Sequence, residues 1–206
     1  MAESYIQIEL GVEDLFDKTL PNPEMLDYYN RISRREIMLN CEIDDTCIEY
    51  AKQIMEWNIA DKDIPVDQRK PISIYIHSGG GNMSSAWALI DAMILSETPI
   101  RTIGIGCMYS AASMIFLAGH KRYCMPHSTY MIHDGYSKSA DSIAKMIDDI
   151  EFTKRGEAVV KDFYLSRTNI TSELYDQKYR VNWYFDTEEM LRYHIADEVI
   201  TSLYQC

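Results

Sequence analysis

The feature that most constrains the fold is a strand-like run followed at once by three glycines and an apolar helical run. The strand-like run is ISIYIH, residues 72–77, rich in β-branched and aromatic side chains, and Gly79–Gly81 come soon after it. The next run, MSSAWALIDAMIL at 83–95, is apolar and long enough for a buried helix. A strand, a glycine turn and a helix in this order predict one unit of a βαβ architecture.

The same alternation continues along the chain. The run IRTIGIG at 100–106 predicts a second strand, and SAASMIFLAG at 110–119 a second helix. Two short strands are expected at 121–125 and 128–133, a helix at about 44–59, and a long helix at 140–168. Asp186 and Glu189 form a capping-box pattern that opens a terminal helix, and IADEVI at 195–200 closes the sheet. We therefore predict an α/β fold with a largely parallel sheet, from which the long helix projects to pair with a neighbouring subunit.

The first forty residues lack this alternation. Residues 4–10 alternate like a short strand, residues 11–25 are acidic and punctuated by proline, and the segment up to residue 40 ends in another short strand. We predict a mobile N-terminal arm over 1–40 and one domain over 41–206.

Composition excludes several function classes. The formal net charge of −12 has no basic block to offset it, so nucleic acid and anionic membranes would be repelled. No apolar run approaches the roughly 20 residues of a membrane span. Five cysteines without C-x-x-C spacing argue against a zinc site and a disulfide framework, and favour a reducing cytoplasm. These cysteines are Cys41, Cys47, Cys107, Cys124 and Cys206.

Unusual polar groups follow three of the predicted strands. They are the Gly79–Gly81 triplet, Ser110 and His133. Since the carboxyl ends of parallel strands meet at one edge of a sheet, these groups can converge into an acyl-transfer site with a hydroxyl nucleophile, an imidazole base and backbone N–H donors. Each also has a purely structural interpretation: Ser110 as a helix cap, His133 as a hydrogen-bonded core histidine, and the glycines as a tight turn. Cys107 is a rival nucleophile, although a buried structural cysteine fits it better.

These segments together resemble the ClpP-type serine peptidases, within the larger fold class that includes the enoyl-CoA hydratases. ISIYIHSGGG is similar to the family's oxyanion glycine motif, GCMYSAASMIFLAG to its nucleophile segment, and KRYCMPHSTYMIH to the strand pair that ends in the catalytic histidine. The resemblance runs from about Tyr29 to about Thr201. It implies a ClpP/crotonase-like α/β fold with repeated ββα and βαβ units, a projecting handle helix, and a pore-gating role for the arm.

The resemblance also implies a role for individual residues. Ser110 becomes the nucleophile, because this alignment keeps Ala118 and Gly119 in register with the family's Ala-Gly pair, whereas Ser113 would shift it. His133 becomes the general base, and the backbone N–H groups of Gly80 and Ala111 become the oxyanion donors. The orienting position falls on Asn182, where the family has an aspartate. Asp134 and Asp186 are alternative partners for the imidazole.

Two further segments depart from the family pattern. His77–Gly81 replaces the family's Asn-Ser-Pro-Gly-Gly, and DGYSKSAD at 134–141 replaces a segment rich in proline and glycine.

The function implied by the resemblance is a serine endopeptidase that degrades unfolded proteins to peptides. It would act inside two stacked seven-membered rings, homo- or hetero-oligomeric, fed by an AAA+ unfoldase, and its hydrolysis needs no metal or cofactor. Asn182 can accept the imidazole N–H but lacks a carboxylate's charge. Two rival functions therefore stay open: a weakly active or inactive regulatory ring subunit, and a crotonase-type acyl-CoA enzyme.

Overall fold

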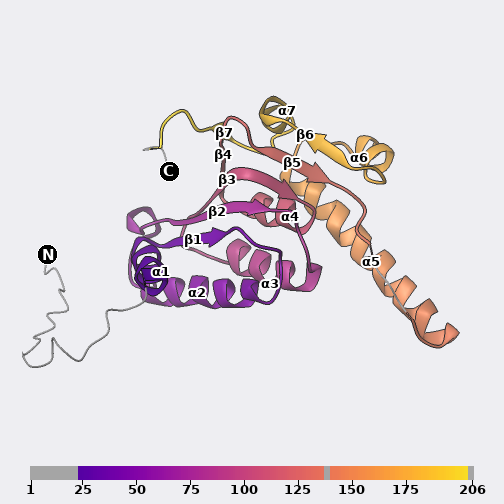
Figure 1. Cartoon of the computed structure of the whole chain (residues 1–206), viewed down its shortest axis with the longest axis horizontal. Coiled ribbons are helices and arrows are strands. Elements are labelled where there is room, and N and C mark those ends of the chain that lie inside the picture. The colour runs from indigo at the N-terminus through magenta and orange to yellow at the C-terminus, as the bar shows by residue number, and fades with distance from the viewer. Residues whose placement is uncertain (1–22, 137–139, 204–206) are drawn as a thin grey trace, which may run out of the picture. The chain divides into compact units, whose positions relative to one another are not determined.

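The computed structural model describes residues 23–136 and 140–203 (Figure 1). The chain divides into two compact units, Met1–Arg34 and Arg35–Cys206.

The described part of the first unit is a helix, α1 (Pro23–Arg34). The expectation of an irregular arm was therefore wrong for these residues. Pro23 occupies the first helical position, where its fixed φ suits the helix and its missing N–H costs nothing. Arg31 Nε also donates to Asp27 Oδ2 at 2.8 Å, one turn away. The strand predicted at 4–10, like the rest of the arm before Pro23, lies outside the described residues.

The second unit is built on a sheet in which, within the described part of the chain, seven strands take part. The order is β1-β2-β3-β4-β7, with β5 pairing β3 and β6 pairing β5. Every pairing is parallel except that of β5 with β6. The predicted α/β fold with a largely parallel sheet is confirmed. The strands are β1 (Glu36–Leu39), β2 (Ile72–Ser78), β3 (Ile100–Tyr109), β4 (Lys121–Cys124), β5 (Thr129–Ile132), β6 (Trp183–Phe185) and β7 (Glu198–Val199).

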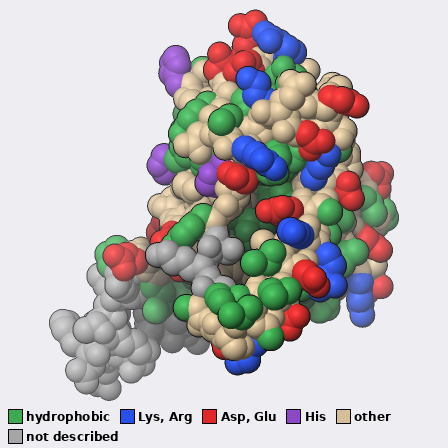
Figure 2. Space-filling model, turned by 90° about the vertical axis from the view of Figure 1, so that its right-hand side faces the viewer, with side chains coloured by type: hydrophobic (Ala, Val, Ile, Leu, Met, Phe, Trp, Pro, Cys, Tyr) green, Lys and Arg blue, Asp and Glu red, His purple; other side chains and the backbone are tan. Residues whose placement is uncertain are grey.

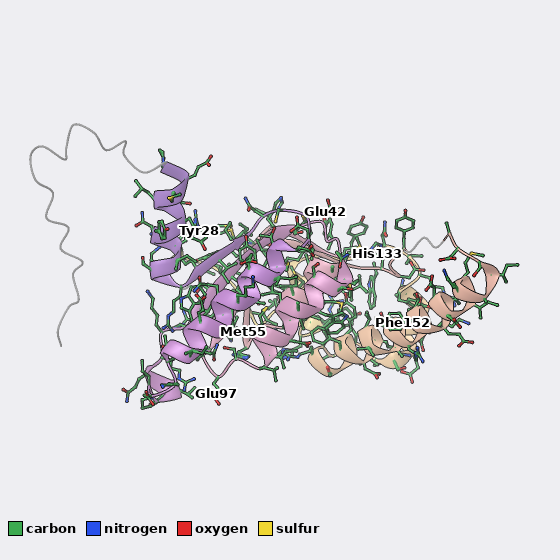
Figure 3. The ribbon with its side chains drawn as sticks, turned by 90° about the horizontal axis from the view of Figure 1, so that it is seen from below. Tyr28, Glu42, Met55, Glu97, His133 and Phe152 are labelled. Atoms are coloured by element: carbon green, nitrogen blue, oxygen red, sulfur yellow. The ribbon has the colours of Figure 1, made fainter. Side chains whose placement is uncertain are left out.

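The helices of this unit follow the predicted alternation. Figure 1 shows α5 projecting away from the sheet, and Figure 3 shows α2 running beside α3. The predicted capping box is present: Asp186 accepts the N–H of Glu189, and the Glu189 side chain accepts the N–H of Asp186. The helices are α2 (Thr46–Ala60), the 3₁₀ helix η2 (Val66–Gln68), α3 (Met83–Ile94), α4 (Ala111–Leu117), α5 (Ile143–Arg167), α6 (Ser172–Lys178) and α7 (Thr187–Arg192).

The core lies between the sheet and its helices. Strand β2 is central, between β1 and β3, and its three isoleucines Ile72, Ile74 and Ile76 are fully buried. Every residue of α4 is buried as well, which explains why this segment is almost continuously apolar. The buried elements β2, β3 and α4 thus fix the positions of the turns that follow the strands.

The cysteines that the structure describes, Cys41, Cys47, Cys107 and Cys124, are free thiols. No helix in residues 23–136 and 140–203 is long and apolar enough to cross a membrane.

One buried ion pair ties the start of the sheet to the end of α2. Asp61 is 1% exposed, and both its carboxylate oxygens accept hydrogen bonds from the Arg35 guanidinium, one of them at 2.7 Å. Thr98 Oγ1 donates to the same carboxylate at 2.9 Å. These hydrogen bonds, chiefly those from Arg35, hold the pKa of Asp61 below its ordinary value.

We expect Asp61→Asn to lower the free energy of unfolding by about 3 kcal/mol at pH 7, because it leaves the Arg35 charge unpaired. A carboxyl whose folded pKa is depressed stabilises the protein above its unfolded pKa, and this stability is lost as pH falls through the folded pKa. The difference between wild type and Asp61→Asn should therefore shrink below about pH 4. Urea unfolding at a series of pH values measures it. Asp63→Asn, at an exposed carboxylate nearby, is the control and should differ little from wild type.

Candidate active site

Four polar or glycine segments lie at the carboxyl ends of neighbouring parallel strands. Glu42 follows β1, Gly79–Gly81 follow β2, Ser110 follows β3 and His133 follows β5. Figure 3 shows Glu42 and His133 in the middle part of this unit, whereas Glu97 lies toward one end of it. The convergence expected from the sequence is thus present in the fold.

Ser110 stands at a strained turn between β3 and α4. Its φ of +55° lies in the left-handed region, which non-glycine residues seldom adopt. Its backbone N–H donates to Met131 O at 3.0 Å, which ties the turn to β5. Such a strained turn exposes a side chain at the sheet edge, and strain of this kind persists only where the surrounding structure enforces it.

The Ser110 hydroxyl lies against the imidazole of His133. The distance from Ser110 Oγ to His133 Nε2 is 2.8 Å, a normal hydrogen-bond length. For Nε2 to accept the hydroxyl proton, the neutral ring must carry its own proton on Nδ1. The structure therefore brings together a hydroxyl and a base in the arrangement that activates a nucleophile.

Asn182, which the sequence predicts to orient the imidazole, immediately precedes β6. Strand β6 pairs antiparallel with β5 as far as Ile132 opposite Trp183, and His133 and Asn182 are the residues just beyond the end of this ladder. Asn182 is exposed, and no hydrogen bond joins it to His133 among the residues that the structure describes. Asp186 is occupied elsewhere, because its carboxylate caps α7 through Glu189 N at 2.8 Å.

Gly80 lies directly against the turn that holds Ser110. Its φ is +101°, and a Cβ added there would stand 2.7 Å from Ser110 Cβ and 3.2 Å from Ala111 N. The Ala111 N–H begins α4 and has no acceptor among the described residues, as expected in the first turn of a helix. The Gly80 N–H, however, donates to Ser78 Oγ at 3.2 Å.

The sequence points to Gly81 only as part of the glycine triplet, and its backbone pairing with Ile43 is a feature that sequence reasoning missed. It bridges Ile43 in parallel, so that Gly80 O accepts from Ile43 N at 2.9 Å and Asn82 N donates to Ile43 O at 2.7 Å. In this pattern the N–H of Gly81 itself points to the side away from Ile43. It has no acceptor in the described part of the chain. An open cavity of about 380 Å³, lined by Glu42 and the three glycines, adjoins this segment.

Comparison with known proteins identifies the family. A model of the Clp protease family matches residues 21–203, nearly the whole chain. The chain belongs to the Clp protease family. The resemblance drawn from the three motifs is therefore confirmed.

Individual members of the Clp protease family are similar along most of their length. The ATP-dependent Clp protease proteolytic subunit of Chlorella vulgaris is 28% identical over 182 residues, covering 87% of this chain and 88% of the relative. The proteolytic subunit 2 of Nocardia farcinica is 31% identical over 180 residues, with 84% of each chain covered. Among solved structures, an Asn-to-Asp variant of ClpP1 from Listeria monocytogenes superposes with a TM-score of 0.73, at 21% identity, over 85% of this chain and 96% of that one. The last comparison supports the ClpP fold.

Gly80→Ala tests whether this Clp protease family member needs the close approach at Gly80. An alanine would be strained at φ +101° and would meet Ser110 Cβ, so we expect a loss of about 1–3 kcal/mol of stability. Labelling of Ser110 by a fluorophosphonate should slow by about tenfold or more, because the hydroxyl is displaced. The control is Gly156→Ala, in open space on α5, which should label at the wild-type rate. Equal labelling of both variants would contradict this account of Gly80.

Proposed function

We propose that this chain is a serine endopeptidase subunit that cleaves unfolded polypeptides inside an oligomeric chamber. The observation that carries the proposal is the 2.8 Å contact between Ser110 Oγ and His133 Nε2 at a strained strand-to-helix turn. His133 takes the hydroxyl proton as Ser110 attacks the peptide carbonyl, and then gives it to the leaving amine. Water, deprotonated by the same imidazole, releases the acyl group from Ser110.

The developing oxyanion needs backbone donors, and we assign this role to Ala111 and to the glycine segment. The N–H of Ala111 has no acceptor among the described residues and belongs to the residue directly after the nucleophile. The second donor comes from the glycine segment, where Gly80 lies closest to Ser110 and Gly81 has its N–H on the side away from Ile43. Such donors stabilise negative charge that forms only during the reaction.

The glycine segment also suits an extended peptide. The outward side of Gly81 behaves as an unpaired strand edge, and the adjoining cavity is open. A substrate that adds to this edge by main-chain hydrogen bonds is recognised with little regard to its side chains. Unfolded polypeptide is therefore the substrate class that we propose.

Assembly into rings is the second part of the proposal. Helix α5 projects from the sheet, and Figure 2 shows hydrophobic side chains among charged ones on the side toward which it projects. Such side chains are best covered by self-association, and we propose stacked seven-membered rings, either homo- or hetero-oligomeric. An AAA+ unfoldase would feed unfolded polypeptide into these rings. We also propose a cytoplasmic location, to which the free thiols are suited. The exposed residues of α5 include Ile143, Ile147, Ile150, Phe152 and Val159.

A regulatory subunit of low activity is the second candidate, favoured by one observation. Asn182 is neutral and is not hydrogen-bonded to His133 among the described residues, so the imidazole lacks a fixed orienting partner. Both candidates share the fold and the assembly. They differ in whether the neutral amide of Asn182 is enough to orient His133 for catalysis.

We expect the purified protein to cleave a small fluorogenic peptide, and Ser110→Ala to abolish cleavage, because Ser110 carries the hydroxyl that is hydrogen-bonded to His133. Asn182→Asp should leave kcat unchanged or raise it, since a carboxylate stabilises the imidazolium. The oligomer mass of each variant is recorded beside its activity. A silent wild type with an active Asn182→Asp of equal mass would establish the regulatory candidate instead. Activity that survives in Ser110→Ala would refute the proposed nucleophile.

A further inference from the structure

Ser113 is a buried serine whose hydroxyl touches the nucleophile turn from the core side. It lies in α4, is 0% exposed, and its Oγ is 2.6 Å from the carbonyl oxygen of Ser110. The same Oγ is 2.6 Å from the hydroxyl of Tyr164, a residue of α5 that is 2% exposed. Burying two hydroxyl groups in an otherwise apolar layer is costly unless each is hydrogen-bonded, and here each is.

The direction of these two hydrogen bonds follows from counting protons. A carbonyl oxygen can only accept, so Ser113 gives its single hydroxyl proton to Ser110 O. Ser113 Oγ must then accept from Tyr164, which makes the phenol the donor. Burial raises the pKa of Tyr164, which keeps that donor protonated. The result is a one-way relay from Tyr164 through Ser113 to the Ser110 carbonyl.

The carbonyl at the end of this relay shares a peptide unit with the Ala111 N–H. In a planar trans peptide the C=O and the N–H point in opposite directions, so fixing one fixes the other. The Ser113 backbone N–H also donates to Ser110 O, at 2.9 Å, so the carbonyl is held by two donors from the core side. The Ala111 N–H is thereby turned away from these donors, and Gly80 lies next to its nitrogen.

We propose that Ser113 and Tyr164 are positioning residues that aim the Ala111 N–H at the oxyanion. The inference rests on the proposed peptidase function and deepens it, because it assigns the orientation of one oxyanion donor to a side chain of α5. Neither side chain touches the substrate. Their effect passes through the peptide plane between Ser110 and Ala111.

The test compares Ser113→Ala, Tyr164→Phe and the double variant with wild type on a fluorogenic peptide. Loss of an oxyanion donor costs about 10²–10³ in kcat, and a donor that is only misaimed costs less, so we expect about a tenfold fall in kcat for Ser113→Ala. Tyr164→Phe should lower kcat about threefold, since Ser113 keeps its own bond to Ser110. The double variant should match Ser113→Ala, because the two groups act in series. KM and the shape of the pH profile should be unchanged.

Tyr130→Phe is the matched control. The Tyr130 hydroxyl is also fully buried, and the hydrogen bond that it donates goes to the Ser113 carbonyl at 3.0 Å rather than to the Ser110 carbonyl. We expect its kcat to stay within about twofold of wild type. The affinity of a peptide boronate, which forms a tetrahedral adduct on Ser110, should fall in Ser113→Ala and Tyr164→Phe in proportion to kcat/KM and stay unchanged in Tyr130→Phe.

Two outcomes would overturn the inference: a kcat of Ser113→Ala within twofold of wild type, or an equal fall in Tyr130→Phe, which would point to packing alone. If wild type lacks peptidase activity, the proposed function fails separately. Crystal structures of wild type and Ser113→Ala then decide the inference. A rotated peptide plane between Ser110 and Ala111 would support it, and an unchanged plane would overturn it.

Discussion

Strand β3 shares one of its edges between two partners, and this sharing organises the site. It pairs with β4 over Arg101–Gly104 and then with β5 over Cys107–Tyr109, while β2 lies along its other edge. The ladder with β5 ends just before Ser110, whose N–H still reaches Met131 O at 3.0 Å. His133, two residues after Met131, is consequently carried to the hydroxyl. The 2.8 Å contact between the two side chains therefore depends on the register of β3 with β5.

Much of this arrangement can be predicted from the sequence, because hydrophobic period and glycine placement are local signals. The strand at 72–77, the turn glycines and the buried helix after Ser110 are each visible within about ten residues of sequence. Helix α1 was not predicted, because acidic residues and prolines are typical of an irregular surface segment. Proline is also common at the first position of a helix, where Pro23 lies. Ser113 and Tyr164 are separated by the rest of α4, by β4 and β5, and by most of α5, so no local pattern predicts their contact.

The weakest part of the candidate site is the partner of the imidazole, because Asn182 is neutral and makes no hydrogen bond to His133 among the described residues. The antiparallel ladder of β5 and β6 ends next to His133 and Asn182, and the orienting role of Asn182 belongs to the proposed function. An amide there offers a neutral acceptor, whereas imidazolium formation is stabilised by a charge. In the serine-protease triad an Asp-to-Asn change lowers kcat about 10⁴-fold, chiefly through the imidazole tautomer. A site with Asn182 must therefore fix the tautomer by position alone, which explains why turnover is the property that separates the two candidate functions.

The free donor at Ala111 is a consequence of how the helix begins. The first N–H groups of any helix lack intrahelical acceptors, and a strand-to-helix turn leaves them at the sheet edge, next to the residue that ends the strand. Their orientation is set by the peptide planes of the turn, and here Ser110 holds its plane at a strained φ of +55°. Strain of this kind relaxes unless the carbonyl is held, and two donors from Ser113 hold it. The C=O of Ser110, which Ser113 holds, and the N–H of Ala111, which has no acceptor among the described residues, thus belong to the same peptide unit.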